Sequence, residues 1–285
     1  MKLLRHIAEV RAELAPDRRA GRRVGFVPTM GALHEGHGSL IDACRRECDR
    51  CVVSIFVNPL QFGPSEDFER YPRDLEADLA FCRARGVDVV FAPSVEEMYP
   101  EPPLTFVVVE QLSEPLCGRS RPGHFRGVAT VCAKLFHIVQ PDVAYFGQKD
   151  AQQATILRRM VEDLNFPLQI RVLPTVREPD GLALSSRNRY LSAGEREAAG
   201  CLFLALSEAA ELARKGERDA AVLVAAMARE IGATQGVRLD YAAVVDEATF
   251  EEVREVRGPA RALVAAWVGS TRLIDNLPLP EPSAR

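Results

Sequence analysis

The feature that most constrains the fold is residues 25–40, GFVPTMGALHEGHGSL, in which an apolar strand gives way to a glycine-rich turn. Val24–Val27 has the apolar character of a buried strand. Pro28 and Gly31 interrupt it, and a helical rhythm returns from residue 39 to residue 47. A strand, a turn and a helix in this order form the repeating unit of an open α/β sheet, so we expect a parallel sheet around this stretch.

Two histidines, His34 and His37, lie three residues apart where that helix begins. At this spacing two side chains share one face of a helix, about 5–6 Å apart at Cβ. The helix N-terminus adds unpaired N–H groups and the positive end of the helix dipole, which favour a bound phosphate. The alternative is that one histidine caps the helix and the other faces solvent. These residues alone leave both interpretations open.

Composition limits the class of protein and of partner. A chain of 285 residues exceeds the usual size of one domain, and 47% hydrophobic residues suffice for a core. The net charge of −4, without a dense Lys/Arg block, argues against nucleic acid as a partner. Residues 1–14 lack the continuous apolar core of a signal peptide, and no apolar run of 18 residues follows. We therefore expect a cytoplasmic protein that does not bind membranes.

The seven cysteines, an odd number, favour free thiols in a reducing compartment over a disulfide framework. Cys44, Cys48 and Cys51 have the CxxxCxxC spacing with which radical enzymes hold an iron–sulfur cluster. The first two are expected in a helix and the third at the start of a strand, so we do not expect the three sulfur atoms to converge. An iron–sulfur protein is kept as the alternative from a different class of function.

The strand–turn–helix rhythm continues to about residue 190, which predicts a Rossmann-like α/β domain over residues 1–190. Residues 1–14 have helical spacing. The further elements expected in this domain are strands over 51–57, 87–91, 105–109, 143–146 and 168–172, and helices over 74–85 and 128–139.

A second domain is expected over residues 191–285. Ser192 and Glu195 form a capping box ahead of an apolar periodic run, which predicts a helix to about residue 214. A second helix over 219–233 and strands over 239–245, 261–268 and 271–274 complete an α+β pattern. We expect this smaller domain to act as a lid over the active site.

Polar residues follow several of the predicted strands, where ligands bind in open α/β sheets. Asn58 and Gln61 follow the strand over 51–57, although an Asn before Pro is also a common turn former. Lys149, Asp150 and Gln153 follow the strand over 143–146. A surface cation and a helix N-cap are the alternatives for Lys149 and Asp150.

Two further groups lie outside these turns. Ser185, Ser186 and Arg187 belong to a polar cluster that is either an exposed loop or a phosphate clamp. Asp78 lies near the start of the helix over 74–85, where an acidic solvated face is the ordinary interpretation. No GxxxxGK[ST], HExxH or GxSxG motif occurs, which removes the signatures of several other enzyme classes.

Six segments of the chain resemble, in order and spacing, motifs of the pantothenate synthetase (pantoate–β-alanine ligase) family. They are PTMGALHEGH, FVNPLQF, YPRDLEADL, RPGHFRGV, YFGQKDAQQ and DGLALSSRNRYL. The resemblance implies a carbon–nitrogen ligase of vitamin B5 and coenzyme A biosynthesis, which condenses pantoate with β-alanine. The implied route consumes ATP, forms an enzyme-bound pantoyl adenylate, and releases pyrophosphate and AMP with the assistance of Mg²⁺. It also implies a homodimer formed through the N-terminal domain.

The same resemblance implies roles for individual residues. His34, His37 and Lys149 are the implied catalytic residues, acting on the phosphates of ATP. Pantoate is assigned to Thr29, Met30, Asn58, Gln61 and Gln153. The ATP-binding set comprises Met30, His34, His37, Gly147, Lys149, Asp150, Val176, Leu184, Ser185, Ser186 and Arg187. Asp78 aligns with an acidic Mg²⁺ position, although the preceding residue, acidic in some members, is Ala77 here. The alternative within the superfamily is another adenylyl-transferring nucleotidyltransferase.

Overall fold

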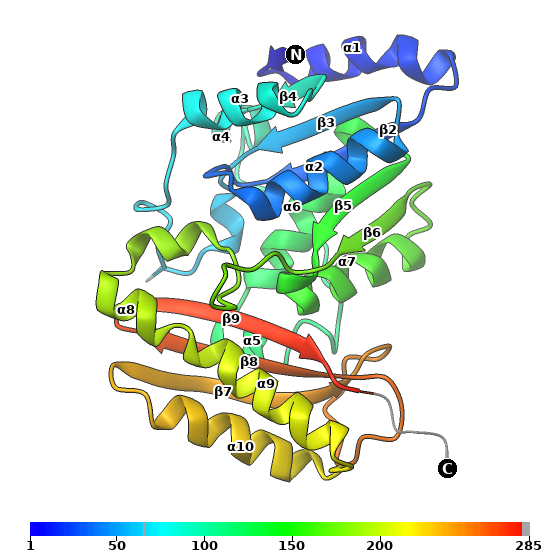
Figure 1. The fold of residues 1–285 in the computed structure, drawn as a ribbon. Coiled ribbons are helices and arrows are strands. Elements are labelled where there is room, and N and C mark those ends of the chain that lie inside the picture. The colour runs from blue at the N-terminus through cyan, green and yellow to red at the C-terminus, as the bar shows by residue number, and fades with distance from the viewer. Residues whose placement is uncertain (65, 281–285) are drawn as a thin grey trace. The chain divides into compact units, whose positions relative to one another are not determined.

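The computed structural model describes residues 1–64 and 66–280, which belong to two compact units (Figure 1). Unit 1 comprises Met1–Gln148 and Gln153–Pro174, and unit 2 comprises Lys149–Gln152 and Thr175–Arg285. Residues 175–190 thus group with unit 2, whereas the sequence pattern placed them in the first domain. A division into folding domains at residue 190 stays a proposal.

Unit 1 contains a six-stranded sheet in which every neighbouring pair of strands is parallel. The parallel α/β sheet predicted from the strand–turn–helix rhythm is therefore confirmed. The order of the strands is β1-β4-β3-β2-β5-β6. Their bounds are β1 Lys2–Leu4, β2 Val24–Thr29, β3 Arg50–Ile55, β4 Val89–Phe91, β5 Val143–Gly147 and β6 Gln169–Leu173.

Helices cover both faces of this sheet, as a parallel sheet requires. Val27, Val53 and Tyr145 pack with α2 and α3 in one apolar cluster. Their strand neighbours, such as Phe26 and Val52, point to the opposite face and are fully buried. The helices are α1 Ile7–Arg19, α2 Glu35–Glu47, α3 Leu75–Ala84, α4 Val95–Met98, α5 Cys117–Ser120, α6 His124–Val139 and α7 Ala151–Asp163, with short 3₁₀ turns η1 Pro59–Gln61 and η2 Gln148–Asp150.

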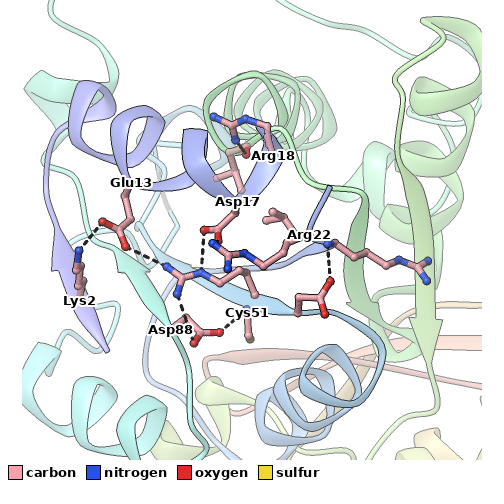
Figure 2. Close-up of polar contacts among 12 residues, drawn as sticks. Lys2, Glu13, Asp17, Arg18, Arg22, Cys51 and Asp88 are labelled. Atoms are coloured by element: carbon pink, nitrogen blue, oxygen red, sulfur yellow. Dashed lines mark hydrogen bonds and ion pairs between the residues drawn. The ribbon is translucent and has the colours of Figure 1, made fainter. Parts of the chain in front are cut away.

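The N-terminal segment differs from its expected helical form, because Lys2–Leu4 pairs as β1 with β4 before α1 begins at Ile7. A network of ion pairs stabilises this arrangement (Figure 2). Glu13 on α1 accepts from Lys2 at 2.6 Å and from Arg50 at 3.0 Å, and the buried Asp17 pairs with Arg50 at 3.0 Å. A strand of three residues is too short to show the two-residue alternation that identifies a strand in sequence, so β1 was not predicted.

The strand expected over residues 105–109 is absent from both sheets. The amide of Val107 instead donates to Oγ1 of Thr130 on α6, at 3.0 Å. Leu104 is 96% exposed, and Phe106 and Val108 are also exposed. The apolar β-branched run of residues 105–109 favours a strand, but none of the strands in the described residues pairs with it.

Unit 2 is the predicted α+β arrangement, an antiparallel sheet in the order β7-β8-β9 packed against helices. The capping box of Ser192 and Glu195 is confirmed. The single helix expected to residue 214 is interrupted near Gly200 and forms α8 and α9. The bounds are η3 Ser186–Tyr190, α8 Ala193–Ala198, α9 Cys201–Arg214, α10 Ala220–Gly232, β7 Val237–Asp246, β8 Ala260–Val268 and β9 Thr271–Pro278.

None of the helices in the described part of the chain has both the length and the apolar composition needed to span a bilayer.

Candidate active site

The turn between β2 and α2 is held in an unusual backbone conformation by a buried carboxylate. Gly31 has φ +82° and Ala32 has φ +51°, in the left-handed region that non-glycine residues rarely adopt. Asp78 on α3 accepts from the amide of Ala32 at 3.0 Å and from that of Leu33 at 2.7 Å, one with each oxygen. Asp78 is 4% exposed. Its carboxylate therefore fixes the turn that precedes the two histidines.

His34 and His37 form a reciprocal cap at the start of α2. Nδ1 of His34 accepts from the amide of Gly36 at 3.1 Å, and Nδ1 of His37 accepts from the amide of His34 at 3.3 Å. Since a backbone amide can only donate, the neutral rings must have their protons on Nε2. The ring centroids are 4.1 Å apart. The cap interpretation is thus correct for His34, but His37 joins the cap and is half-buried where that interpretation had it facing solvent. In both rings the remaining Nε2–H group is a donor that suits an anion.

The carboxyl end of β2 is also tied to β3. Oγ1 of Thr29 donates to the carbonyl of Ser54 at 2.7 Å and accepts from the amide of Gly31 at 3.1 Å. Met30, the next residue, has its Sδ atom 3.1 Å from Nε2 of Gln61. These contacts bring the predicted pantoate residues Thr29, Met30 and Gln61 to neighbouring strand ends.

Asn58 and Gln61 lie together in the turn that follows β3. Asn58 is 1% exposed and Gln61 is 8% exposed. Nδ2 of Asn58 donates to Oε1 of Gln61 and to the carbonyl of Gly127, both at 3.1 Å. Oδ1 of Asn58 accepts from Tyr99 Oη at 3.0 Å and from the amide of Leu60 at 3.4 Å. Both the turn-forming role and a place beside Gln61 are therefore confirmed for Asn58.

The candidate residues around β5 divide between the two units. Gly147 ends β5 and Gln153 is a half-buried residue of α7, both in unit 1. Lys149 and Asp150 belong to unit 2, where Nζ of Lys149 is 3.7 Å from Oδ1 of Asp150. The carbonyl of Lys149 accepts from Nδ2 of Asn276 on β9 at 3.0 Å. Lys149 is nevertheless only two residues beyond the end of β5 in the chain, a span of at most about 7 Å.

The remaining ATP-binding candidates form a compact turn in unit 2. The amide of Leu184 donates to the carbonyl of Val176 at 3.0 Å. Ser185 caps η3, with its Oγ accepting from the amide of Arg187 at 3.2 Å. Ser186 is 7% exposed. The cluster is therefore an ordered turn, not the exposed loop that was the alternative, and its role toward phosphate stays a prediction.

The three cysteines of the CxxxCxxC pattern are free and buried, and the thiols of Cys44 and Cys48 lie near Gly25. Cys44 lies in α2, Cys48 follows the helix and Cys51 lies in β3. The neighbouring thiols of Cys48 and Cys51 raise the pKa of Cys44, while Cys44 lowers the pKa of Cys48 to about 7.

In the described residues, no cluster of three or more His, Cys, Asp or Glu side chains has an arrangement that could hold a metal ion. The helix α2 ends at Glu47, so Cys48 is its C-cap with an extended backbone (φ −131°, ψ 151°) and does not lie within the helix as expected.

Sequence reasoning did not find the backbone role of Asp78, nor the contacts of Arg121 and His124 with the turn of Gln61. The motif RPGHFRGV was recognised by resemblance without a role. A buried carboxylate in an otherwise solvated helix start is visible only once the fold is known.

The chain is similar to known proteins over almost its full length. A family model described as pantoate-beta-alanine ligase matches residues 2–278. A pantothenate synthetase of Moorella thermoacetica is 57% identical over 279 residues, which cover 98% of this chain and 99% of the relative. A pantothenate synthetase of Acidobacterium capsulatum is 60% identical over 263 residues, which cover 92% of this chain and 88% of the relative.

Solved structures agree with these relatives. The crystal structure of pantothenate synthetase from Thermus thermophilus has a TM-score of 0.93 and 50% identity, covering 97% of this chain and 99% of that one. A pantoate-beta-alanine ligase from Francisella tularensis, complexed with beta-gamma ATP and beta-alanine, has a TM-score of 0.79 and 34% identity. This match covers 97% of this chain and 97% of the Francisella ligase.

Proposed function

The chain belongs to the pantoate-beta-alanine ligase family and condenses pantoate with β-alanine in an ATP-dependent reaction; we propose that it does so through a pantoyl adenylate formed at the carboxyl ends of β2, β3 and β5. The observation that supports this place is the pair of histidines at the N-terminus of α2, both with Nδ1 engaged by backbone amides. Their Nε2–H groups, together with the helix dipole, suit the phosphates of ATP.

In the first step a carboxylate oxygen of pantoate attacks the α-phosphorus of ATP, and the bond to the β-phosphate oxygen breaks to release pyrophosphate. The carboxylate is ionised at pH 7, so this step needs alignment and charge stabilisation, and no general base. We assign His34 and His37 to the phosphates and Lys149 to the charge that develops on the α-phosphate. Ser185, Ser186 and Arg187 are assigned to the β- and γ-phosphates, and Gly147, Asp150, Val176 and Leu184 to the nucleoside.

In the second step the neutral amine of β-alanine attacks the acyl carbon of the adenylate. The bond from the acyl carbon to the phosphate oxygen breaks, AMP leaves, and the nitrogen loses a proton to solvent, which gives pantothenate. Pantoate is assigned to Gln61, Gln153, Thr29 and Met30, with Asn58 beside them. The relative from Francisella, which was crystallised with ATP and β-alanine compounds, supports these two as substrates here.

Mg²⁺ is proposed to enter with the triphosphate, whose charge it neutralises. The structure does not favour Asp78 as its ligand, because both carboxylate oxygens accept backbone amides and the side chain is buried. We therefore assign no step to a metal bound at Asp78.

A homodimer through unit 1 is also proposed, in the cytoplasm. Leu104, Phe106 and Val108 expose apolar surface in a segment that pairs with none of the strands found in residues 1–64 and 66–280. A second copy that covers this segment would bury it. Leu104→Asp with Val108→Asp should convert the dimer to a monomer in light scattering, and a wild-type monomer at micromolar concentration would contradict the proposal.

The activity is tested by measuring AMP and pyrophosphate while ATP, pantoate and β-alanine are omitted in turn. Pyrophosphate release should require pantoate but not β-alanine, and AMP release should require all three. AMP release without β-alanine would favour another adenylyl-transferring enzyme, which family membership does not favour. Lys149→Ala should lose most of kcat, whereas Lys215→Ala, at an exposed position, should not change it.

A further inference from the structure

The motif RPGHFRGV, residues 121–128, has no role in the reaction described above, yet it contacts the turn that contains Gln61. Nδ1 of His124 lies 2.8 Å from the carbonyl oxygen of Gln61, and Nη2 of Arg121 lies 3.4 Å from the same oxygen. His124 is 7% exposed. The main chain of Gln61 is thus held by two side chains from the start of α6.

The contacts of His124 determine its protonation. A carbonyl oxygen can only accept, so Nδ1 of His124 donates to Gln61. Nη1 of Arg121 lies 2.9 Å from Nε2 of His124, and a guanidinium can only donate, so Nε2 accepts. The ring is therefore the neutral tautomer with its proton on Nδ1, opposite to the tautomer of His34 and His37.

Glu66 completes this arrangement from the loop after Gln61. Its two carboxylate oxygens accept from Nε and Nη2 of Arg121, at 2.8 and 2.5 Å. Although burial favours the neutral acid, the hydrogen bonds and charge of Arg121 hold the pKa of Glu66 below its usual value. An ionised Glu66 orients the guanidinium so that its remaining N–H groups reach His124 and Gln61.

The side chain of Gln61 is held from its other side by Asn58. Oδ1 of Asn58 is engaged by Tyr99 and the amide of Leu60, so Nδ2 must face Oε1 of Gln61 and the carbonyl of Gly127. All four hydrogen-bonding positions of this amide are used. Gln61 must then present its own Nε2–H₂ group away from Asn58, on the side of Met30.

Close packing leaves this turn little freedom. A Cβ atom added to Gly127 would lie 2.2 Å from the carbonyl oxygen of Leu60. The backbone of α6 thus touches the backbone of η1 directly, and only glycine allows this approach.

We propose that His124 and Asn58 are positioning residues for pantoate: together they fix Gln61 so that its side-chain amide donates to the acid. The proposal rests on the assignment of Gln61 to pantoate. Neither residue contacts the substrate, since the hydrogen-bonding atoms of both already have protein partners.

The test distinguishes the role of Nδ1 of His124 from that of Nε2. An Asn side chain places an amide N–H near the position of Nδ1, and a Gln side chain places an amide near that of Nε2. His124→Leu should raise the pantoate KM by about tenfold and leave the ATP KM within about twofold, as the loss of one buried hydrogen bond predicts. His124→Asn should recover most of the loss, and His124→Gln should not.

The control is His137→Leu, the same change at an exposed position of α6, which should alter neither KM. Asn58→Asp, an isosteric change that removes the donor to Gln61, should also raise the pantoate KM. Equal rises in the pantoate and ATP KM values, or equal rescue by Asn and Gln, would overturn the proposal. If His124→Leu does not fold, the Asn and Gln variants still decide the question.

Gln61→Ala distinguishes this proposal from the one on which it rests. If Gln61→Ala leaves the pantoate KM unchanged, the assignment of Gln61 to pantoate is wrong, whatever His124 does. If Gln61→Ala raises the pantoate KM and His124→Leu does not, Gln61 binds pantoate without the help of His124.

Discussion

The two ends of α2 are built on different physical principles. At its N-terminus, the turn of residues 31–37 is fixed by directional hydrogen bonds that Asp78, His34 and His37 accept from backbone amides. At its C-terminus, the thiols of Cys44 and Cys48 pack against Gly25 at the start of β2. The first end, which we propose to be a ligand site, is ordered by polar groups, and the second fills space in the core.

This difference leads to opposite expectations for substitutions. Changes at the N-terminal end should alter kinetics, because the groups that hold the turn and those proposed to contact ATP lie there. Changes at the C-terminal end should alter the free energy of unfolding and leave the kinetics unchanged, because close packing there has no part in the proposed chemistry.

The largest effect is expected from His37. His37→Ala should slow pyrophosphate release by about 10²–10³-fold, as when one donor to transition-state charge is removed. His37→Asn keeps an acceptor near Nδ1 for the amide of His34 but has no group at Nε2, so it should be stable and equally slow. His37→Gln, with an amide near Nε2, should be faster than His37→Asn. Single-turnover release of pyrophosphate is the measurement, and a wild-type rate in His37→Asn would remove Nε2 from the mechanism.

Asp78 should be the next most sensitive position. Asp78→Ala leaves two buried amides without an acceptor and should cost about 2–4 kcal/mol of unfolding free energy. It should also slow adenylation, since the turn before His34 is no longer fixed. Asp78→Asn keeps one carbonyl acceptor, so its stability and its adenylation rate should lie between those of the wild type and Asp78→Ala. Urea unfolding and the Mg²⁺ dependence of kcat decide this role: a raised Mg²⁺ requirement in Asp78→Asn would show that Asp78 binds the metal after all.

The sequence was sufficient for the parallel sheet, the α+β unit and the strand–turn–helix of residues 24–47, because each rests on a local pattern. It was insufficient where contacts between residues distant in sequence decide which segments pair and which groups hydrogen-bond. The segment over 105–109 has the apolar, β-branched composition of a strand but no partner among the described strands, and β1 is too short to show a periodic pattern. Asp78 and His124 belong to recognised motifs, yet their partners are backbone groups of distant residues that no spacing reveals.

At the other end of α2, Gly25→Ala tests packing. The added Cβ would lie 2.3 Å from Sγ of Cys44 and 2.9 Å from Sγ of Cys48, both on buried residues. Overpacking of this kind should cost about 1–3 kcal/mol, measured by urea unfolding, with kcat and both KM values unchanged. Adding Cys44→Ala should restore part of the loss, because it removes the closest atom. A loss of activity in the folded variant would contradict the separation of the two ends.

The smallest effect on stability is expected from Gly38→Ala, the same glycine-to-alanine change made within α2 itself. A Cβ there would lie 2.7 Å from Nε of Arg85, a distance between the 2.3 Å and 2.9 Å of the two contacts at Gly25. The atom it meets, however, belongs to the end of a flexible side chain, whose guanidinium pairs with the exposed Glu35 and stacks on Phe81 at 3.8 Å. Moving that group costs little, since such exposed pairs contribute about 0–1 kcal/mol, and alanine gains about 0.5–1 kcal/mol over glycine within a helix.

Gly38→Ala should therefore change the free energy of unfolding by less than about 0.5 kcal/mol, and Arg85→Ala with Gly38→Ala should be no less stable than Arg85→Ala alone. The pair of Gly25→Ala and Gly38→Ala isolates one variable, because the two changes add the same methyl group and differ in whether the neighbour can move. If both variants lose the same stability in urea, the thiols at the C-terminal end of α2 are no more rigidly packed than the half-buried Arg85, and the contrast between the two ends does not rest on packing.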